Sequence, residues 1–105
     1  AASDVYKRQF RYNAIQINRN VQTKPHHDRN NAGPSYCLAI GDYQGGGLTI
    51  YPEGAPAYTL DNRYKWVLYN GAKLEHGSAP TRNGVRYALV FYQSTPHGKK
   101  RRHSR

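Results

Sequence analysis

Two histidines and one aspartate in this chain have the residue types and the spacing that bind a metal ion. His26 and Asp28 are separated by one residue, so in an extended segment their side chains share a face, while His27 points away. The third ligand has to come from a distant segment, and His76 is the histidine in the later part of the expected domain. Two imidazoles and one carboxylate suit iron(II) and leave coordination positions open. The spacing therefore predicts a metal centre of His26, Asp28 and His76.

An arginine near the third ligand makes this interpretation more specific. An isolated H-x-D pair is weak evidence, because it is frequent by chance, and such residues are often ordinary polar groups of loops or surfaces. Arg86 lies ten residues after His76, at the start of the last expected strand. Its guanidinium is a planar fork that suits bidentate binding of a carboxylate. We therefore predict that Arg86 binds a carboxylate of a co-substrate.

The segments that must position these residues have the patterns of short strands. Glycine and proline turns separate them, and Gln44-Gly45-Gly46 and Asn70-Gly71 are hairpin signals. The first strand has apolar residues on both sides, as a strand buried on both faces would have. With about seven strands and no long helical period, the sequence predicts an all-β sandwich or small barrel. Strands are expected over residues 10–21, 36–43, 47–51, 57–60, 64–69, 73–76 and 86–93.

Both ends of the chain are expected to lie outside this domain, which would span residues 10–95. Residues 4–9 match the translation of a transposase adapter used to build sequencing libraries, so residues 1–9 are expected to be an artefact; a natural N-terminal segment is the alternative. The chain contains no methionine, which agrees with a piece of a longer protein. Residues 96–105 carry five basic residues and nothing apolar to bury, so they are expected to form a disordered tail.

Charge and composition exclude some functions. The net charge is +10, but residues 10–95 carry only nine basic against five acidic residues. The basicity therefore lies mostly in the tail and does not by itself predict a nucleic-acid-binding surface. No apolar run approaches the length of a transmembrane helix, so no membrane contact is expected. The single cysteine, Cys37, weakly favours a reducing, intracellular compartment, with nucleus and cytoplasm both open.

The order of H-x-D, a distal histidine and an arginine on the last strand resembles the 2-oxoglutarate- and iron(II)-dependent dioxygenases. Residues 41–48 are similar to the D-x-x-x-G-G-x-L stretch of prolyl-hydroxylase-like members, and residues 26–31 to the H-x-D-x-x-N pattern of the TET and J-binding-protein base hydroxylases. Residues 66–70 and 84–90 resemble their closing strands. The resemblance covers roughly residues 16–93.

The resemblance implies a fold, cofactors and a reaction. The fold would be a double-stranded β-helix, also called a jelly roll or cupin-like fold, here without its N-terminal part. Iron(II), 2-oxoglutarate and dioxygen would be needed, with the iron on His26, Asp28 and His76, the co-substrate on Arg86 and no further catalytic side chain. Decarboxylation of 2-oxoglutarate to succinate would accompany hydroxylation of a C–H bond. One departure is Ala88, because many members carry serine two residues after the arginine, where it contacts the co-substrate.

Substrate and rival functions stay open at this point. A protein side chain is favoured by the glycine hairpin, and a nucleic-acid base by the H-x-D-x-x-N run and the basic tail, which could also be a nuclear address or have no role. The rival of another class is a non-enzymatic cupin-like module that binds a metal or a sugar. Such a module has no need of a carboxylate clamp, so Arg86 favours the oxygenase.

Several other polar residues have a functional and an ordinary interpretation. Asn18 could reach the co-substrate from the first strand, whereas Asn31 is more typical of turn chemistry than of ligand binding. His27 and Glu75 are neighbours of ligands and are expected to face away from the metal. Cys37 is more typical of a small core residue than of a reactive thiol.

Overall fold

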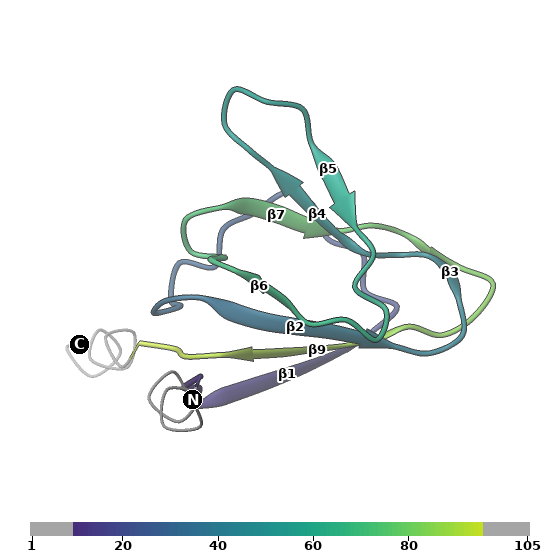
Figure 1. Ribbon diagram of the computed structural model, residues 1–105, viewed down its shortest axis with the longest axis horizontal. Coiled ribbons are helices and arrows are strands. Elements are labelled where there is room, and N and C mark those ends of the chain that lie inside the picture. Colours follow the sequence, from purple (N-terminus) through teal and green to yellow (C-terminus); the bar gives the residue numbers. More distant parts are fainter. Residues whose placement is uncertain (1–9, 96–105) are drawn as a thin grey trace, which may run out of the picture.

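Nine β-strands and no helix make up residues 10–95, the part of the chain that the computed structural model describes (Figure 1). All strand pairs are antiparallel, and the all-β prediction is confirmed. These residues accordingly include no helix that could cross a membrane. The predicted artefact at residues 1–9 and the predicted tail at residues 96–105 lie outside the described residues. The strands are β1 (Ala14–Arg19), β2 (Ser35–Ile40), β3 (Gln44–Gly45), β4 (Leu48–Tyr51), β5 (Tyr58–Leu60), β6 (Val67–Tyr69), β7 (Glu75–Ser78), β8 (Thr81–Arg82) and β9 (Tyr87–Tyr92).

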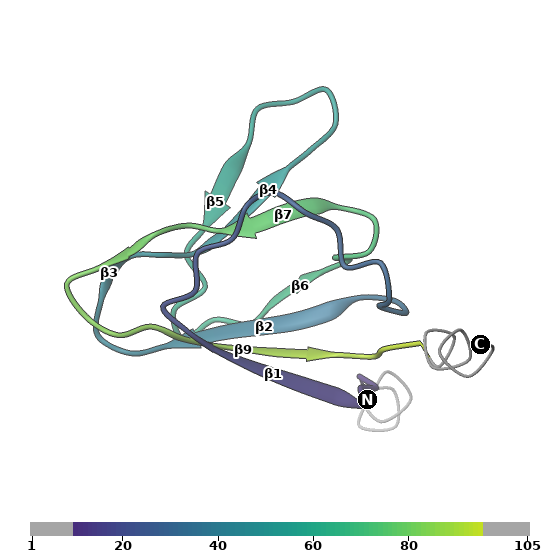
Figure 2. The same cartoon turned by 180° about the vertical axis from the view of Figure 1, so that it is seen from behind.

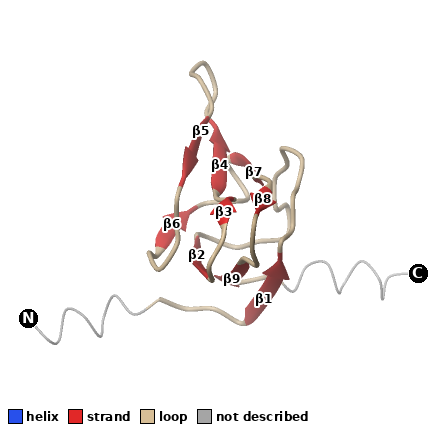
Figure 3. Cartoon of the chain, turned by 90° about the vertical axis from the view of Figure 1, so that its right-hand side faces the viewer, coloured by secondary structure: helices blue, strands red, loops and turns tan. Residues whose placement is uncertain are grey.

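The strands form two facing layers. One layer is a four-stranded sheet in the order β1-β9-β2-β6, and the other is a three-stranded sheet in the order β5-β4-β7 (Figures 1 and 2). The short strands β3 and β8 pair with each other at the end of the molecule that faces the viewer in Figure 3. Strands that are distant in sequence pair within each layer, as β1 does with β9. This is the layered arrangement of the jelly roll predicted from the sequence.

The core lies between the two layers because the strands alternate. In β2, Ser35, Cys37 and Ala39 are buried, whereas the residues between them are half-buried. Cys37 and Ala88 of the larger sheet belong to the same buried cluster as Leu48 and Ile50 of β4. A cavity lined in part by Cys37, Leu48 and Ala88 opens within this core.

The outer face of the larger sheet is apolar and exposed within the described residues. Ile15 and Ile17 of β1 are 50% and 65% exposed, so the expectation of a first strand buried on both faces is not met. Trp66 and Leu68, at the other edge of the sheet, are also exposed. The first strand thus has apolar residues on both sides, but Ile15 and Ile17 stay exposed; on this outer face Phe10 and Tyr12 contact the rings of Tyr36 and Phe91.

Both predicted hairpins are wrong. After β2 the chain does not turn back to pair with β2; it passes through β3 into β4 of the other layer. The partners of β2 are instead β6 and β9. Gly45, Gly46 and Gly47 all have left-handed φ values, of 71°, 71° and 112°, which redirect the chain between layers. Gly71 likewise lies where the chain leaves β6 for β7, which pairs with β4. The hairpin of the smaller sheet is β4–β5, which projects from the body (Figure 1).

Candidate metal centre

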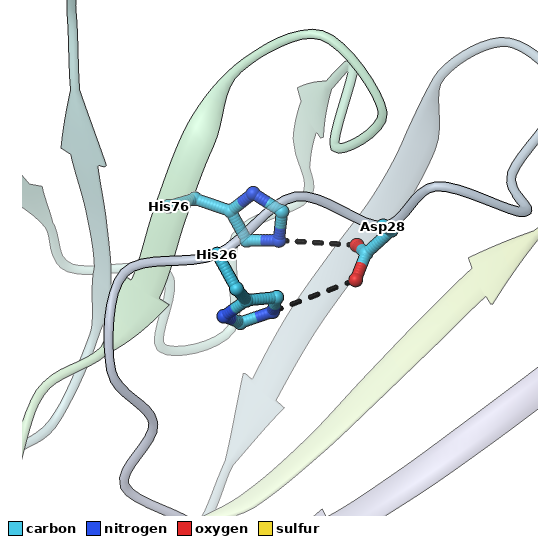
Figure 4. Close-up of side chains that lie close together, drawn as sticks. All are labelled: His26, Asp28 and His76. Atoms are coloured by element: carbon cyan, nitrogen blue, oxygen red, sulfur yellow. Dashed lines mark ion pairs between the residues drawn. The ribbon is translucent and has the colours of Figure 1, made fainter.

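His26, Asp28 and His76 meet at one point of the sandwich, although they come from two distant segments (Figure 4). The Nε2 atom of His76 lies 3.0 Å from Oδ2 of Asp28. The Nε2 atom of His26 lies 3.5 Å from the other carboxylate oxygen. One ligand atom from each residue fits within 4.8 Å of the other two. The structure thus brings together the three residues that the sequence singled out.

A short backbone pairing sets this geometry. The N–H of His26 donates to the carbonyl of His76 at 2.9 Å, and the N–H of His76 donates back at 3.0 Å. Two residues on, the N–H of Asp28 donates to the carbonyl of Gly71 at 2.8 Å. Because the segment is extended, His26 and Asp28 share a face. His27 lines a different hollow of the surface, as expected.

The backbone also orients both imidazole rings. Nδ1 of His26 lies 2.7 Å from the carbonyl oxygen of Lys24, and Nδ1 of His76 lies 2.8 Å from that of Leu74. A carbonyl can only accept, so each Nδ1 carries the proton and donates it. When the ring is neutral, Nε2 keeps its lone pair and faces the carboxylate. Two imidazole nitrogens and one carboxylate, held by outer hydrogen bonds, are a donor set that fits iron(II).

Asp28 and His76 shift each other's pKa. The hydrogen bond from His76 lowers the pKa of Asp28, against the opposing effect of burial. Burial disfavours the charged form of His76, but the hydrogen bonds to Asp28 and to the Leu74 carbonyl outweigh it and raise its pKa. The pair therefore favours an imidazolium beside a carboxylate. A metal ion that binds here has to displace that proton.

Gly71 leaves the space that the site occupies. A Cβ atom at this position would lie 2.6 Å from Oδ2 of Asp28 and 3.0 Å from Cε1 of His76. The φ angle of Gly71 is not left-handed, so space rather than backbone conformation requires glycine here. The sequence indicated only a turn at Asn70-Gly71, and no local signal distinguishes a turn glycine from one that lies against a site.

A cavity of about 130 Å³ joins the three residues to Arg86. Arg86 directly precedes β9 and is the only lysine or arginine among the described residues that line this cavity. Asn18 also lines it, in agreement with its predicted reach, whereas Asn31 does not and instead donates to Ser35 Oγ at 3.4 Å. The further polar side chains of the wall are Gln16, Thr23, Ser78 and Tyr69.

Arg86 is a buried cation without a counter-ion among the described residues. It is only 3% exposed, and no carboxylate of residues 10–95 forms an ion pair with it. Its Nη2 donates to Oδ1 of Asn62 at 2.8 Å, while its buried Nε has no hydrogen-bond partner. A buried charge that lacks a partner is costly. The cavity can therefore bind an anion at this end and a cation at the other.

Two residues near Arg86 were not predicted from the sequence. Asn62 is fully buried, but an asparagine in a polar stretch between strands is indistinguishable from turn chemistry. Thr81 has a buried hydroxyl without a partner, and this hydroxyl and Arg86 Nε would lie 3.2 Å and 3.1 Å from a Cβ placed on Gly46. A hydroxyl is thus present near the guanidinium, although Ala88 provides none.

Cys37 and Glu75 occupy the positions expected of them. Cys37 is a buried core residue whose Sγ accepts a hydrogen bond from Asn62 at 3.2 Å, and burial raises the pKa of its thiol. Glu75 lines the same surface hollow as His27 and faces away from the three candidate ligands. Neither residue adds a reactive group to the site.

Solved structures with this fold include two oxygenases. An oxidoreductase of the 2OG-Fe(II) oxygenase family from Burkholderia pseudomallei is 24% identical, with a TM-score of 0.64, over 74% of this chain and 40% of its own. NgTET1, solved in complex with 5mC DNA, is 19% identical, with a TM-score of 0.64, over 77% of this chain and 33% of its own. The chain therefore has the double-stranded β-helix fold of these oxygenases and spans less than half the length of each. No protein-family model matches the chain, and no curated protein sequence is similar to it.

Proposed function

We propose that the chain carries the catalytic core of an iron(II)- and 2-oxoglutarate-dependent dioxygenase that hydroxylates a C–H bond. The observation that carries this proposal is the placement around one cavity of His26, Asp28, His76 and Arg86, which has no counter-ion among residues 10–95. A buried guanidinium repels a nearby metal ion and brings no advantage to a module that binds only a metal. It is useful where an anion bridges the two charges. The buried guanidinium therefore favours the oxygenase over a cupin-like metal or sugar binder.

Four residues of the cavity have a role in this proposal. The carboxylate of Asp28 and the Nε2 atoms of His26 and His76 would hold iron(II), and the backbone carbonyls bonded to Nδ1 would keep both rings in the coordinating orientation. Arg86 would bind the far carboxylate of 2-oxoglutarate through a charge-assisted hydrogen bond. Bound iron would supply the activation of dioxygen, with one oxygen atom going to the substrate and the other to succinate as carbon dioxide leaves.

For the substrate we favour a nucleic-acid base over a protein side chain. NgTET1, which has this fold, was solved with 5mC DNA, and residues 26–31 carry the H-x-D-x-x-N pattern. The glycine run at residues 45–47, which favoured a protein side chain as a hairpin, forms a crossing between layers instead. The five lysines and arginines within residues 96–105 would contact the phosphate backbone. An assay of one preparation on methylated DNA and on proline-containing peptides distinguishes the two substrate classes, because we expect hydroxylation of the DNA and not of the peptides.

The proposal is tested by whether the metal and the co-substrate bind together. The protein is loaded with iron(II) without oxygen and titrated with 2-oxoglutarate, and the visible charge-transfer absorption of the chelate is recorded. We expect saturable absorption in the wild type and none in His76→Ala. Wild-type protein that binds the metal but shows no response to 2-oxoglutarate would support the metal-binding module and contradict the oxygenase.

A further inference from the structure

Asn62 is a buried amide with both of its polar ends occupied. It is 0% exposed, its Oδ1 accepts from Arg86 Nη2 at 2.8 Å, and its Nδ2 donates to Cys37 Sγ at 3.2 Å. The opposite orientation of the amide would place an N–H group against the guanidinium, which has only donors. The oxygen of Asn62 is therefore directed at Arg86 by its contacts on both sides.

The backbone around this amide is anchored as well. The carbonyl of Asn62 accepts hydrogen bonds from Ala39 N–H at 3.0 Å and from Lys65 N–H at 3.2 Å, which ties the segment to β2. On the other side, the N–H of Arg86 donates to Oδ1 of Asn20 at 2.6 Å, and Asn20 N–H donates to the Arg86 carbonyl at 2.8 Å. The side chain and the backbone of Arg86 are thus held from two directions.

The groups that hold Arg86 are all neutral. The Tyr43 ring centroid lies 5.9 Å from Arg86 Cζ, and an aromatic face stabilises a cation without cancelling its charge. The adjacent acidic residue, Asp61, is exposed, and its Oδ1 accepts from the N–H of Arg63 at 3.1 Å. A buried arginine is usually paired with a carboxylate, which here would be isosteric with the Asn62 amide. The chain places an amide where an acid would neutralise the site.

We infer that Asn62 is a positioning residue that orients the Arg86 guanidinium while leaving its charge available to an anionic ligand. This inference rests on the proposed function, in which that ligand is the dicarboxylate 2-oxoglutarate. Because Asn62 is neutral, Arg86 has no counter-ion among the described residues, and the carboxylate of the ligand would be its counter-ion. Asn62 therefore sets the preference of this end of the cavity for an anion.

Asn62→Asp tests the inference with almost no change in shape. The new carboxylate would lie at hydrogen-bonding distance from Nη2 and form an internal ion pair, and the Cys37 thiol can donate to its second oxygen. We expect the affinity of the iron-loaded protein for 2-oxoglutarate, measured by calorimetry without oxygen, to fall by about 10- to 100-fold. Iron(II) affinity should stay unchanged. Asn13→Asp adds the same charge at an exposed position and should leave both affinities unaltered.

Thermal unfolding of the ligand-free, metal-free chain gives a readout that does not depend on the proposed function. Asn62→Asp should be at least as stable as the wild type, because a buried cation gains a counter-ion, whereas Asn62→Ala should be less stable. If the wild type binds no 2-oxoglutarate, the proposed function fails, and the unfolding comparison still decides the role of Asn62. The inference is overturned if Asn62→Asp is as destabilised as Asn62→Ala. It is also overturned if Asn62→Asp binds 2-oxoglutarate as tightly as the wild type.

Discussion

The Nε2 atom of His76 lies 3.0 Å from the carboxylate of Asp28, and this contact joins strand β7 to the loop that precedes β2. The two residues shift each other's pKa in opposite directions. Because His76 is buried and Asp28 is partly exposed, the pair is open to solvent on one side only. The contact therefore couples the packing of this loop against β7 to the protonation of the site.

The stability of the metal-free protein should reflect this pair. The lowered pKa of Asp28 gives stability that is present above its ordinary value of 3.8 and is lost as the pH falls through the folded-state value. The raised pKa of His76 gives stability that is present below its ordinary value of 6.5 and is lost as the pH rises through the folded-state value. Asp28→Asn should therefore lose most stability, relative to the wild type, between about pH 4 and 6.5.

Urea unfolding of both proteins across the pH range measures this difference. A constant gap in the free energy of unfolding from pH 4 to 9 would show that the contact between Asp28 and His76 contributes no charge-dependent stability.

Loss of a histidine on the cavity side should strongly weaken metal binding, whereas loss of its neighbour should not. His26→Ala removes one of three ligand atoms and should weaken iron(II) binding by more than the roughly 10- to 100-fold typical of losing an outer partner. His27→Ala changes a side chain that lines a different hollow and should bind iron(II) like the wild type. Calorimetry under anaerobic conditions compares the two. Equal losses in both variants would mean that the register of the ligand segment is wrong.

Gly71→Ala should damage the site without unfolding the domain. Its Cβ would lie against Asp28 and His76, so we expect iron(II) affinity to fall about tenfold, as when an outer partner is lost. Gly54→Ala is the matched control, because Gly54 has a left-handed φ of 73° but nothing within 4 Å of the added atom. It should lower stability by about 1 kcal/mol and leave iron(II) affinity unchanged. A loss of iron(II) affinity in Gly54→Ala but not in Gly71→Ala would show that Gly71 does not support the metal site.

Local spacing was enough to predict much of the site. The extended segment at residues 26–28 places alternate side chains on one face, so His26 and Asp28 follow from geometry that involves no distant residue. His76 and Arg86 were found by their order along the chain, and the structure places both at the cavity. The presence of most strands was also predictable, because the alternation of apolar and polar residues and the turn residues that end a strand are visible within a few positions.

Pairing partners and neighbours in space could not be predicted in this way. The glycines at residues 45–47 mark a change of direction, but the layer that the chain joins next depends on where both layers bury their apolar faces. The strands β3 and β8 have two residues each, too few for any alternation. Asn62 and Gly71 matter because of what lies beside them, and those neighbours are remote in sequence. Residue type alone carries no information about either role.

In the proposed function, Arg86 binds the co-substrate and takes no part in metal binding. Truncating one partner of a buried, charge-assisted pair typically costs about 2–5 kcal/mol, so Arg86→Ala should weaken 2-oxoglutarate binding roughly thirtyfold or more. The most direct measurement is calorimetric titration of 2-oxoglutarate into iron(II)-loaded wild type and Arg86→Ala without oxygen, after iron(II) affinity has been measured for both. We expect the two proteins to have equal iron(II) affinities, and the affinity for 2-oxoglutarate to fall by at least that factor in Arg86→Ala. An unchanged affinity of Arg86→Ala for 2-oxoglutarate would contradict the role proposed for Arg86.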